Sequence, residues 1–371
     1  MINVTKILKR SWQILWNYRM LWVFGFVLAL TVGGTNFSRG GGSSSSSGSQ
    51  NNNPKYEYGQ GFAGNTFSEK LNDAFRQAGA AIQTLQAQHP VEFRMGIAVA
   101  ITALIVILIL GIIGAILRYV AETATIRMVD EYEQSGVKVG FRQGWKYGWS
   151  REAWRLFLIN FVVHIPALVL FVILGLVGWW IASTALNGVE SAIVTSLIAG
   201  VGLAFIAILV TVALMVVLYL LRDFAWRIST LENVGAMESL RQATALVKRN
   251  WKSAGLMWLV MIGIKIAWGL AFFILVIPLL VVSIITAVGG LVVAVVPSLL
   301  TAGIASLLAA PDYWPWIFAL VIGFPLFATV AFSPILLVSG WGKTYESNVW
   351  TLTYREIKAL ETVTPAVVDA G

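Results

Sequence analysis

The 371-residue sequence contains no cysteine, and only 12% of its residues are charged. Without cysteine, disulfide bonds, thiolate metal sites and cysteine nucleophiles are excluded. The two histidines, His89 and His164, are too far apart in the chain to form a two-histidine zinc motif on one helix. We therefore predict no catalytic, metal-binding or cofactor-binding residues, and we expect a protein that is not an enzyme.

Apolar residues dominate the chain instead. They make up 58% of the sequence, and the mean hydropathy is +0.78. Several uncharged runs exceed the ~20 residues needed to cross a bilayer, and the charged fraction is well below the roughly 25% of a soluble domain. An all-α, polytopic transmembrane helical bundle with about six spans is predicted. The predicted spans cover residues 15–33, 96–117, 156–182, 192–221, 255–281 and 316–338.

The stretch between the fifth and sixth spans is harder to interpret. Residues 287–314 are apolar but include Gly289-Gly290, Pro297 and Pro311. Irregular backbone at membrane depth must be shielded by protein or line a wet cavity. We predict a re-entrant or interfacial segment on the outer side of the membrane.

Four regions follow from these patterns. They are an N-terminal amphipathic helix with the first span (1–33), an outer region (34–94), the membrane bundle (95–360) and a disordered tail (361–371). Within the outer region, residues 38–53 have the Gly, Ser and Asn content of a flexible linker. Thr66 and Glu69 then form a capping box at the start of an amphipathic helix.

Basic residues indicate the topology. Seven Lys and Arg residues fall in 118–155 and six in 222–252, whereas the short outer loops have none. The positive-inside rule then places both termini in the cytoplasm. A cleaved signal peptide at the N-terminus is the alternative.

The net charge of +8 is also interpreted through the membrane. It is spread over the segments between spans, so it favours anionic lipid headgroups and not nucleic acid. Arg118 and Arg222 are expected to close the second and fourth spans. The predicted interfacial contacts with anionic lipids are Arg118, Arg142, Arg222 and Arg241.

An internal repeat is a further prediction. Three times, a basic amphipathic helix leads into an outward span that returns after an outer connection. The exits Leu117-Arg118 and Leu221-Arg222 also match. Three helical hairpins would explain the pattern, although any interfacial helix before a span has a similar composition. The compared entry segments are residues 11–21, 144–154 and 244–254.

A family resemblance rests on short motifs. Residues 141–145 (FRQGW) and 154–156 (WRL) precede a long apolar run, and residues 240–242 (LRQ) begin a less exact copy. Over residues 95–360 the chain resembles the membrane domain attached to some bacterial glycerophosphodiester phosphodiesterases, and its stand-alone relatives. The soluble phosphodiesterase barrel is absent, so that activity is not implied. The resemblance implies a helical membrane bundle in a bacterial cytoplasmic membrane, near lipid metabolism or envelope transport.

Lys265 is the most unusual residue within a predicted span. About ten residues into a helix, it lies roughly 15 Å deep, where a lysine costs about 2.5–3.5 kcal/mol on insertion scales. His164 lies at nearly the same depth in an equivalent helix if the repeat is real, and Asn160 is one turn before it. We predict that Lys265, His164 and Asn160 form an intramembrane polar site. The alternatives are a snorkelling lysine and a hydrogen-bonded histidine beside Pro166.

Two functions are consistent with this sequence. The first is a non-enzymatic structural or accessory protein that binds lipid or a partner, with the bilayer, anionic lipids, other membrane proteins or a second copy of itself as partners. The second is a transporter or flippase-like carrier with a polar path near His164 and Lys265. A membrane enzyme acting on lipid is the least favoured. A dry core would favour the first function, and a continuous polar cavity the second.

Overall fold

A computed structural model of the chain describes residues 2–40, 90–186, 190–308 and 313–368, with ten further residues between 73 and 88. Every regular element in these ranges is a helix. Five helices are long and apolar enough to cross a membrane, or six if one bent pair counts as a span. The predicted all-α, multi-pass membrane fold is confirmed. The capping box at Thr66 and most of the predicted linker lie outside the described residues.

The chain divides into two compact units. The first contains Met1–Gly40, Ile97–Phe161 and Tyr219–Gly371, and the second contains Gly41–Gly96 and Val162–Leu218. Most of the described packing falls in the first unit, which also holds both of the cavities considered below.

The N-terminal segment is a sharply bent helix pair. Helix α1 (Val4–Asn17) begins at Asn3, whose Oδ1 accepts a hydrogen bond from the Lys6 N–H at 3.0 Å. The chain then turns by 99° into α2 (Met20–Gly40). The predicted amphipathic helix is confirmed, but the first apolar span begins at Met20 and not at residue 15. Helix α2 also continues to Gly40, past the predicted start of the linker.

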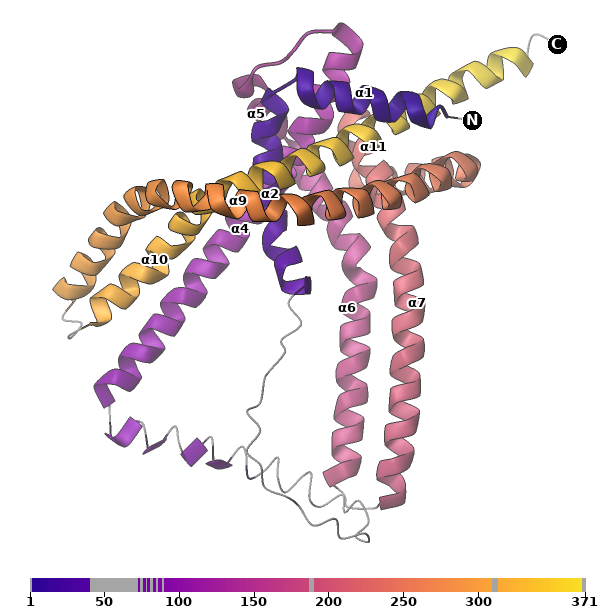
Figure 1. Ribbon diagram of the computed structural model, residues 1–371. Coiled ribbons are helices and arrows are strands. Elements are labelled where there is room, and N and C mark those ends of the chain that lie inside the picture. Colours follow the sequence, from indigo (N-terminus) through magenta and orange to yellow (C-terminus); the bar gives the residue numbers. More distant parts are fainter. Residues whose placement is uncertain are drawn as a thin grey trace. The chain divides into compact units, whose positions relative to one another are not determined.

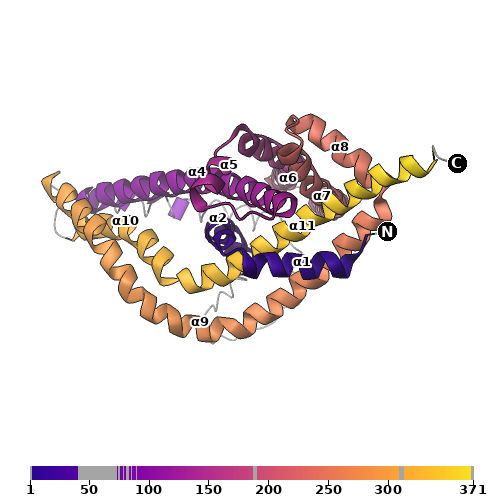
Figure 2. The ribbon, with the colours of Figure 1, turned by 90° about the horizontal axis from the view of Figure 1, so that it is seen from above.

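The buried face of α1 is rotated from the one that helical periodicity predicts. We expected Val4, Leu8, Trp12 and Leu15 to share the apolar face. In the structure the buried residues are Ile7, Ser11, Ile14 and Leu15, and Trp12 is exposed. Helix α1 packs along α11 (Ser333–Val368), and Figure 2 shows the two helices side by side. Contact with α11 therefore determines which face of α1 is buried, and helical periodicity alone did not identify that face.

The polar ends of three long helices form the centre of the packed core. Helix α4 (Pro90–Ser135) and helix α7 (Glu190–Leu231) both continue past Arg118 and Arg222, the predicted ends of their spans. Each has eight consecutive buried residues beyond that arginine, and α11 has a run of the same length. The buried runs are 119–126, 223–230 and 347–354. The segments expected at the solvated interface are thus enclosed by protein.

Short amphipathic helices precede two further long helices. Helix α5 (Phe141–Gly148) leads into α6 (Arg151–Leu186), and α8 (Ala236–Arg249) leads into α9 (Trp251–Leu307). The order of elements matches that of α1 and α2. The threefold repeat itself stays a prediction.

Residues 287–307 do not form the broken segment that we predicted. They continue α9, which has 57 residues and contains Pro278 and Pro297. At 1.5 Å per residue, its length of roughly 85 Å is far above the ~30 Å of a hydrocarbon core. Helix α9 bends, and α10 (Trp314–Ala331) returns beside its C-terminal part (Figure 1). Proline is tolerated in such helices because neighbouring groups satisfy the freed carbonyls.

Glycines permit the closest helix contacts in the first unit. A Cβ on Gly340 of α11 would lie 2.6 Å from the carbonyl carbon of Gly25 in α2, so the two backbones touch where these helices cross. From their positions in apolar helices we expected close packing at Gly111, Gly114 and at Gly263 or Gly269. A Cβ on Gly111, Gly263 or Gly269 would have no atom within 4 Å, so that expectation is wrong for these three within the described residues. A Cβ on Gly114 would be in ordinary contact with Cγ2 of Thr31, at 3.8 Å.

The second unit is built on a helical hairpin. It consists of the later part of α6 and the earlier part of α7. A Cβ on Gly200 would lie 2.7 Å from Cδ1 of Ile181, so the two helices approach closely there. His164 is an exposed residue of this unit.

Candidate functional site

A large apolar groove lies between α4 and the break that joins α5 to α6. Its volume is about 760 Å³. Gly148 positions this break, because a Cβ there would lie 2.3 Å from the carbonyl oxygen of Val120. Only a residue without a side chain lets α5 end so close to α4. The groove is lined by Ile112, Ala115, Ile116, Tyr119, Val120, Trp149, Ser150, Arg151, Ala153, Trp154 and Phe157.

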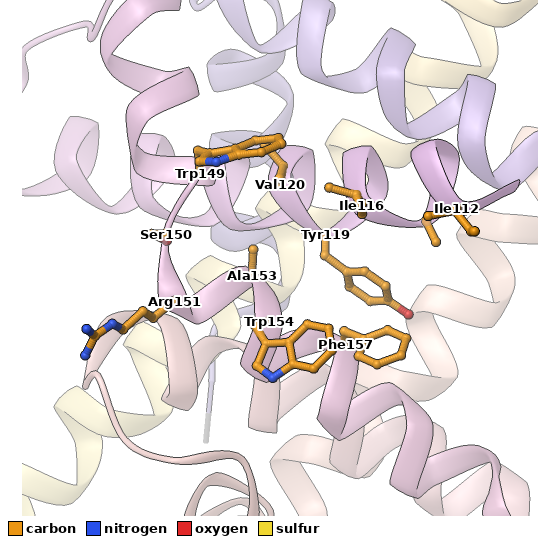
Figure 3. A pocket seen from close by; sticks show the side chains of 11 residues that line it. Ile112, Ile116, Tyr119, Val120, Trp149, Ser150, Arg151, Ala153, Trp154 and Phe157 are labelled. Atoms are coloured by element: carbon orange, nitrogen blue, oxygen red, sulfur yellow. The ribbon is translucent and has the colours of Figure 1, made fainter. Parts of the chain in front are cut away.

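Aromatic rings form the walls of this groove. Trp149 and Trp154 lie on opposite sides of it, with Ala153 between them (Figure 3). Trp154 stacks on Phe157 with ring centroids 4.9 Å apart, and Phe157 meets Tyr119 edge-on at 5.6 Å. These contacts fix the lower wall, and the rings present flat apolar surface that suits a flexible hydrocarbon chain.

Charge is confined to one end of the groove. Arg151 is exposed and points away from the rings (Figure 3). Within the described residues it forms no ion pair. The neighbouring Glu152 is instead bound by Arg127 at 2.9 Å. The groove therefore combines an apolar interior with a free cation at its edge.

A second, polar cavity of about 80 Å³ lies among α2, α4, α7 and α11. Its innermost group is Arg227, which is only 2% exposed. Arg227 donates to Glu122 Oε1 and to Ser347 Oγ, both at 3.3 Å, and to the Asp223 carbonyl oxygen at 2.8 Å. Ser347 in turn donates to Glu122 at 2.9 Å. Buried charges need such partners because desolvation is costly, and here each partner comes from a different helix or turn.

Glu346 lies at the edge of the same cavity. Its carboxylate is 2.6 Å from Lys265 Nζ and 3.8 Å from Lys343 Nζ. Burial alone raises the pKa of Glu346, but the positive charges of Lys343 and Lys265 outweigh it, so the pKa lies below its ordinary value. Lys265 thus has an acidic partner that was not predicted from the sequence.

The structure brings only some of the remaining predicted site residues to the polar cavity. Asn160 Oδ1 accepts from Arg222 at 3.5 Å, and Arg118 and Arg222 both line the polar cavity. His164 belongs to the second unit, so the shared site of Lys265, His164 and Asn160 stays a prediction. The exposed positions of Arg142 on α5 and Arg241 on α8 leave their predicted lipid contacts untested.

Helix α11 connects these sites to the other helices through three ion pairs. Arg355 binds Asp130 of α4, and Lys358 binds Glu232 at the end of α7. Arg249 Nε, at the end of α8, donates to Glu361 at 2.6 Å. Each pair is partly exposed and contributes little alone, but together they fix the position of α11 against three helices. The six residues are Asp130, Glu232, Arg249, Arg355, Lys358 and Glu361.

The carboxylates of the polar cavity were missed from the sequence. Glu122, Asp223 and Glu346 lie in segments that look like ordinary charged loops or interfacial helices. One signal was available: small and hydroxyl residues surround Glu122 and Ser347, which is typical of helices that pack closely on all sides. Among the described residues, no group of three or more acidic or histidine side chains is placed to hold a metal ion.

Comparison with known proteins gives a family but no activity. A model of a family of unknown function (DUF7544) matches residues 4–348. The chain belongs to this family. No curated protein and no solved structure was found to be similar to it. The match covers both cavities, so the residues that line them fall almost entirely within the family region.

Proposed function

We propose that the chain is a non-enzymatic integral membrane protein that binds a membrane lipid in the α4–α6 groove. The groove itself is the observation that carries this proposal. Its volume of about 760 Å³ falls in the roughly 300–1,000 Å³ range of small-molecule sites. An apolar interior of this size suits part of an acyl chain, and Arg151 at its edge suits an acidic headgroup.

The position of the groove along the chain favours a lipid over a soluble ligand. Ile112 and Ile116 belong to the apolar part of α4, whereas Trp149 and Trp154 flank the α5–α6 break. Tryptophan is enriched at the membrane–water interface, where its ring is apolar and its N–H can reach water. The groove would then open at the level where acyl chains meet headgroups.

The finer assignment rests on the sequence. The basic segments between spans support an orientation with both termini in the cytoplasm, and the resemblance to a bacterial membrane domain supports a bacterial cytoplasmic membrane. The resemblance of residues 141–156 to the membrane domain of glycerophosphodiester phosphodiesterases supports a role near lipids, without their hydrolytic activity. An accessory role, through lipid binding or self-association, is the function that these arguments favour.

Native mass spectrometry of the purified full chain tests the proposal. Ile116→Trp fills the groove, whereas the matched control Ile113→Trp adds the same ring to the same helix at an exposed position outside the groove. We expect wild type and the control to retain lipid through purification and Ile116→Trp to lose it. Equal lipid retention by the two tryptophan variants would refute binding in the groove.

A carrier is the second candidate, and the polar cavity favours it. Lys265 and Glu346 form a pair beside that cavity, and a carrier needs a polar path. Flux of a fluorescent lipid across proteoliposomes would distinguish the two functions. A carrier should transfer lipid between leaflets and lose that activity in Glu346→Gln, whereas an accessory protein should bind lipid without transferring it.

A further inference from the structure

The polar cavity has more positive than negative charge. Four cations line it, and Lys265 adds a fifth through Glu346, against three carboxylates. Arg227 is buried, and Arg118 and Arg222 are partly buried, whereas the side chains of Lys343 and Lys265 are 38% and 57% exposed. A positive surplus around partly buried arginines is costly unless an ion of opposite sign offsets it. The cations are Arg118, Arg222, Arg227, Lys343 and Lys265, and the carboxylates are Glu122, Asp223 and Glu346.

Several donors of these cations have no partner within the described residues. The Nε atoms of Arg222 and Arg227 are buried and unbonded. Arg118 forms no ion pair with a described residue and lies over the Tyr119 ring, 5.8 Å from its centroid. Buried donors without acceptors are rare in proteins and call for an explanation. The three carboxylates, by contrast, are each already bound by a cation.

We propose that this cavity binds a phosphate group between Arg118, Arg222 and Lys343. A volume of about 80 Å³ has room for one tetrahedral oxyanion in place of two or three waters, at about 30 Å³ per water. A phosphate monoester supplies up to two negative charges, which match the surplus. Arginine forks bind phosphate oxygens in pairs, and lysine adds a point charge.

The three cations come from three helices that carry the buried core. Arg118 belongs to α4, Arg222 to α7 and Lys343 to α11. Arg222 is held in place by the rings of Tyr219 and Trp226, 4.8 and 4.7 Å away. A bound phosphate would therefore connect three helices, and the site is independent of any occupant of the apolar groove.

Thermal unfolding of the purified full chain tests this site. Inorganic phosphate is titrated against chloride at constant ionic strength, with wild type, Arg118→Gln and the control Arg142→Gln. Arg142 is an exposed arginine outside the cavity. We expect phosphate to raise the unfolding temperature of wild type and of the control. Phosphate should bind Arg118→Gln about tenfold more weakly, because that variant loses one charge-assisted hydrogen bond. Without phosphate, Arg118→Gln should unfold no earlier than wild type, because it removes surplus charge.

A second arm identifies the source of the phosphate group. Nanodiscs of phosphatidic acid and phosphatidylcholine are compared with one of phosphatidylcholine alone, with free phosphate added last. If lipid phosphate fills the cavity, phosphatidic acid stabilises wild type more than Arg118→Gln and removes the effect of free phosphate. If free phosphate is the ligand, its effect persists in both nanodiscs. Equal responses to phosphate and chloride, or equal losses in Arg118→Gln and Arg142→Gln, would overturn the proposal and leave a water-filled cavity.

Discussion

Replacing Gly340 with alanine is expected to push α2 and α11 apart. The new Cβ would lie 2.6 Å from the carbonyl carbon of Gly25, 2.7 Å from its oxygen and 2.8 Å from the nitrogen of Phe26. Carbon atoms in contact are about 3.5–4.0 Å apart, so the helices must separate by about 1 Å. All three neighbours are backbone atoms, and no side-chain rotation can make room for the methyl group.

The expected loss of stability follows from two opposing effects. Overpacking of this kind costs about 1–3 kcal/mol, whereas alanine gains about 0.5–1 kcal/mol over glycine within a helix. We expect a net loss of about 1–2 kcal/mol for Gly340→Ala. Gly263→Ala is the matched control: it makes the same change in a helix, at a site with no atom within 4 Å, and should be neutral or slightly stabilising.

Unfolding by sodium dodecyl sulfate in mixed micelles, followed by far-UV circular dichroism, measures the difference. The sodium dodecyl sulfate concentration at the midpoint of unfolding should fall for Gly340→Ala and stay the same or rise for Gly263→Ala. If both variants shift upward together, the close crossing of α2 and α11 does not exist in the folded protein. The double variant Gly25→Ala with Gly340→Ala should lose less stability than the sum of the two single variants. The separation of α2 and α11 that one methyl group forces already makes room for the other.

Three further predictions concern charged groups. Lys265→Met should lower the free energy of unfolding by about 1 kcal/mol, the scale of a partly exposed ion pair, whereas Lys265→Arg should leave it unchanged. If the methionine variant loses no stability, Lys265 only extends to the interface. In the folded protein the pKa of Glu346 is lowered from its ordinary value of 4.5. The ionised carboxylate therefore stabilises the folded state above pH 4.5, and this contribution is lost as the pH falls through the lowered pKa. Glu346→Gln should therefore show a flatter stability profile between about pH 6 and 3 in thermal unfolding, and an unchanged profile would contradict the ion pair. A cysteine at Lys146 or Lys248 should not react with an impermeant maleimide in intact cells, and labelling from outside would reverse the topology.

Much of the fold could be predicted because long apolar runs leave few alternatives. The helix at residues 4–17 and the apolar helices after residues 96, 156 and 192 follow from composition and periodicity. Helix ends were predicted less well, since an arginine such as Arg118 looks like the end of a span. Helix α4 continues because residues 119–126 are buried on all sides, and a helix buried all round has no apolar periodicity to detect.

The candidate sites depend on contacts between distant parts of the chain. Lys265 was recognised from its depth in an apolar run, but its partner Glu346 belongs to a segment with ordinary charge content. The glycines show the same limit: Gly263 and Gly340 both lie within long helices, and only the position of Gly25 makes Gly340 a contact point. Sequence periodicity describes one helix at a time, whereas these properties belong to helix pairs.

The core joins segments that lie far apart in the chain, and this has a consequence for biosynthesis. Residues 347–354 of α11 complete the core, and α11 supplies the partners of Asp130, Glu232 and Arg249. During translation, the buried ends of α4 and α7 are made well before α11, so they remain without these partners until α11 has left the ribosome. A chain stopped shortly before residue 343 would insert its apolar helices while leaving Glu122 and Arg227 without Ser347.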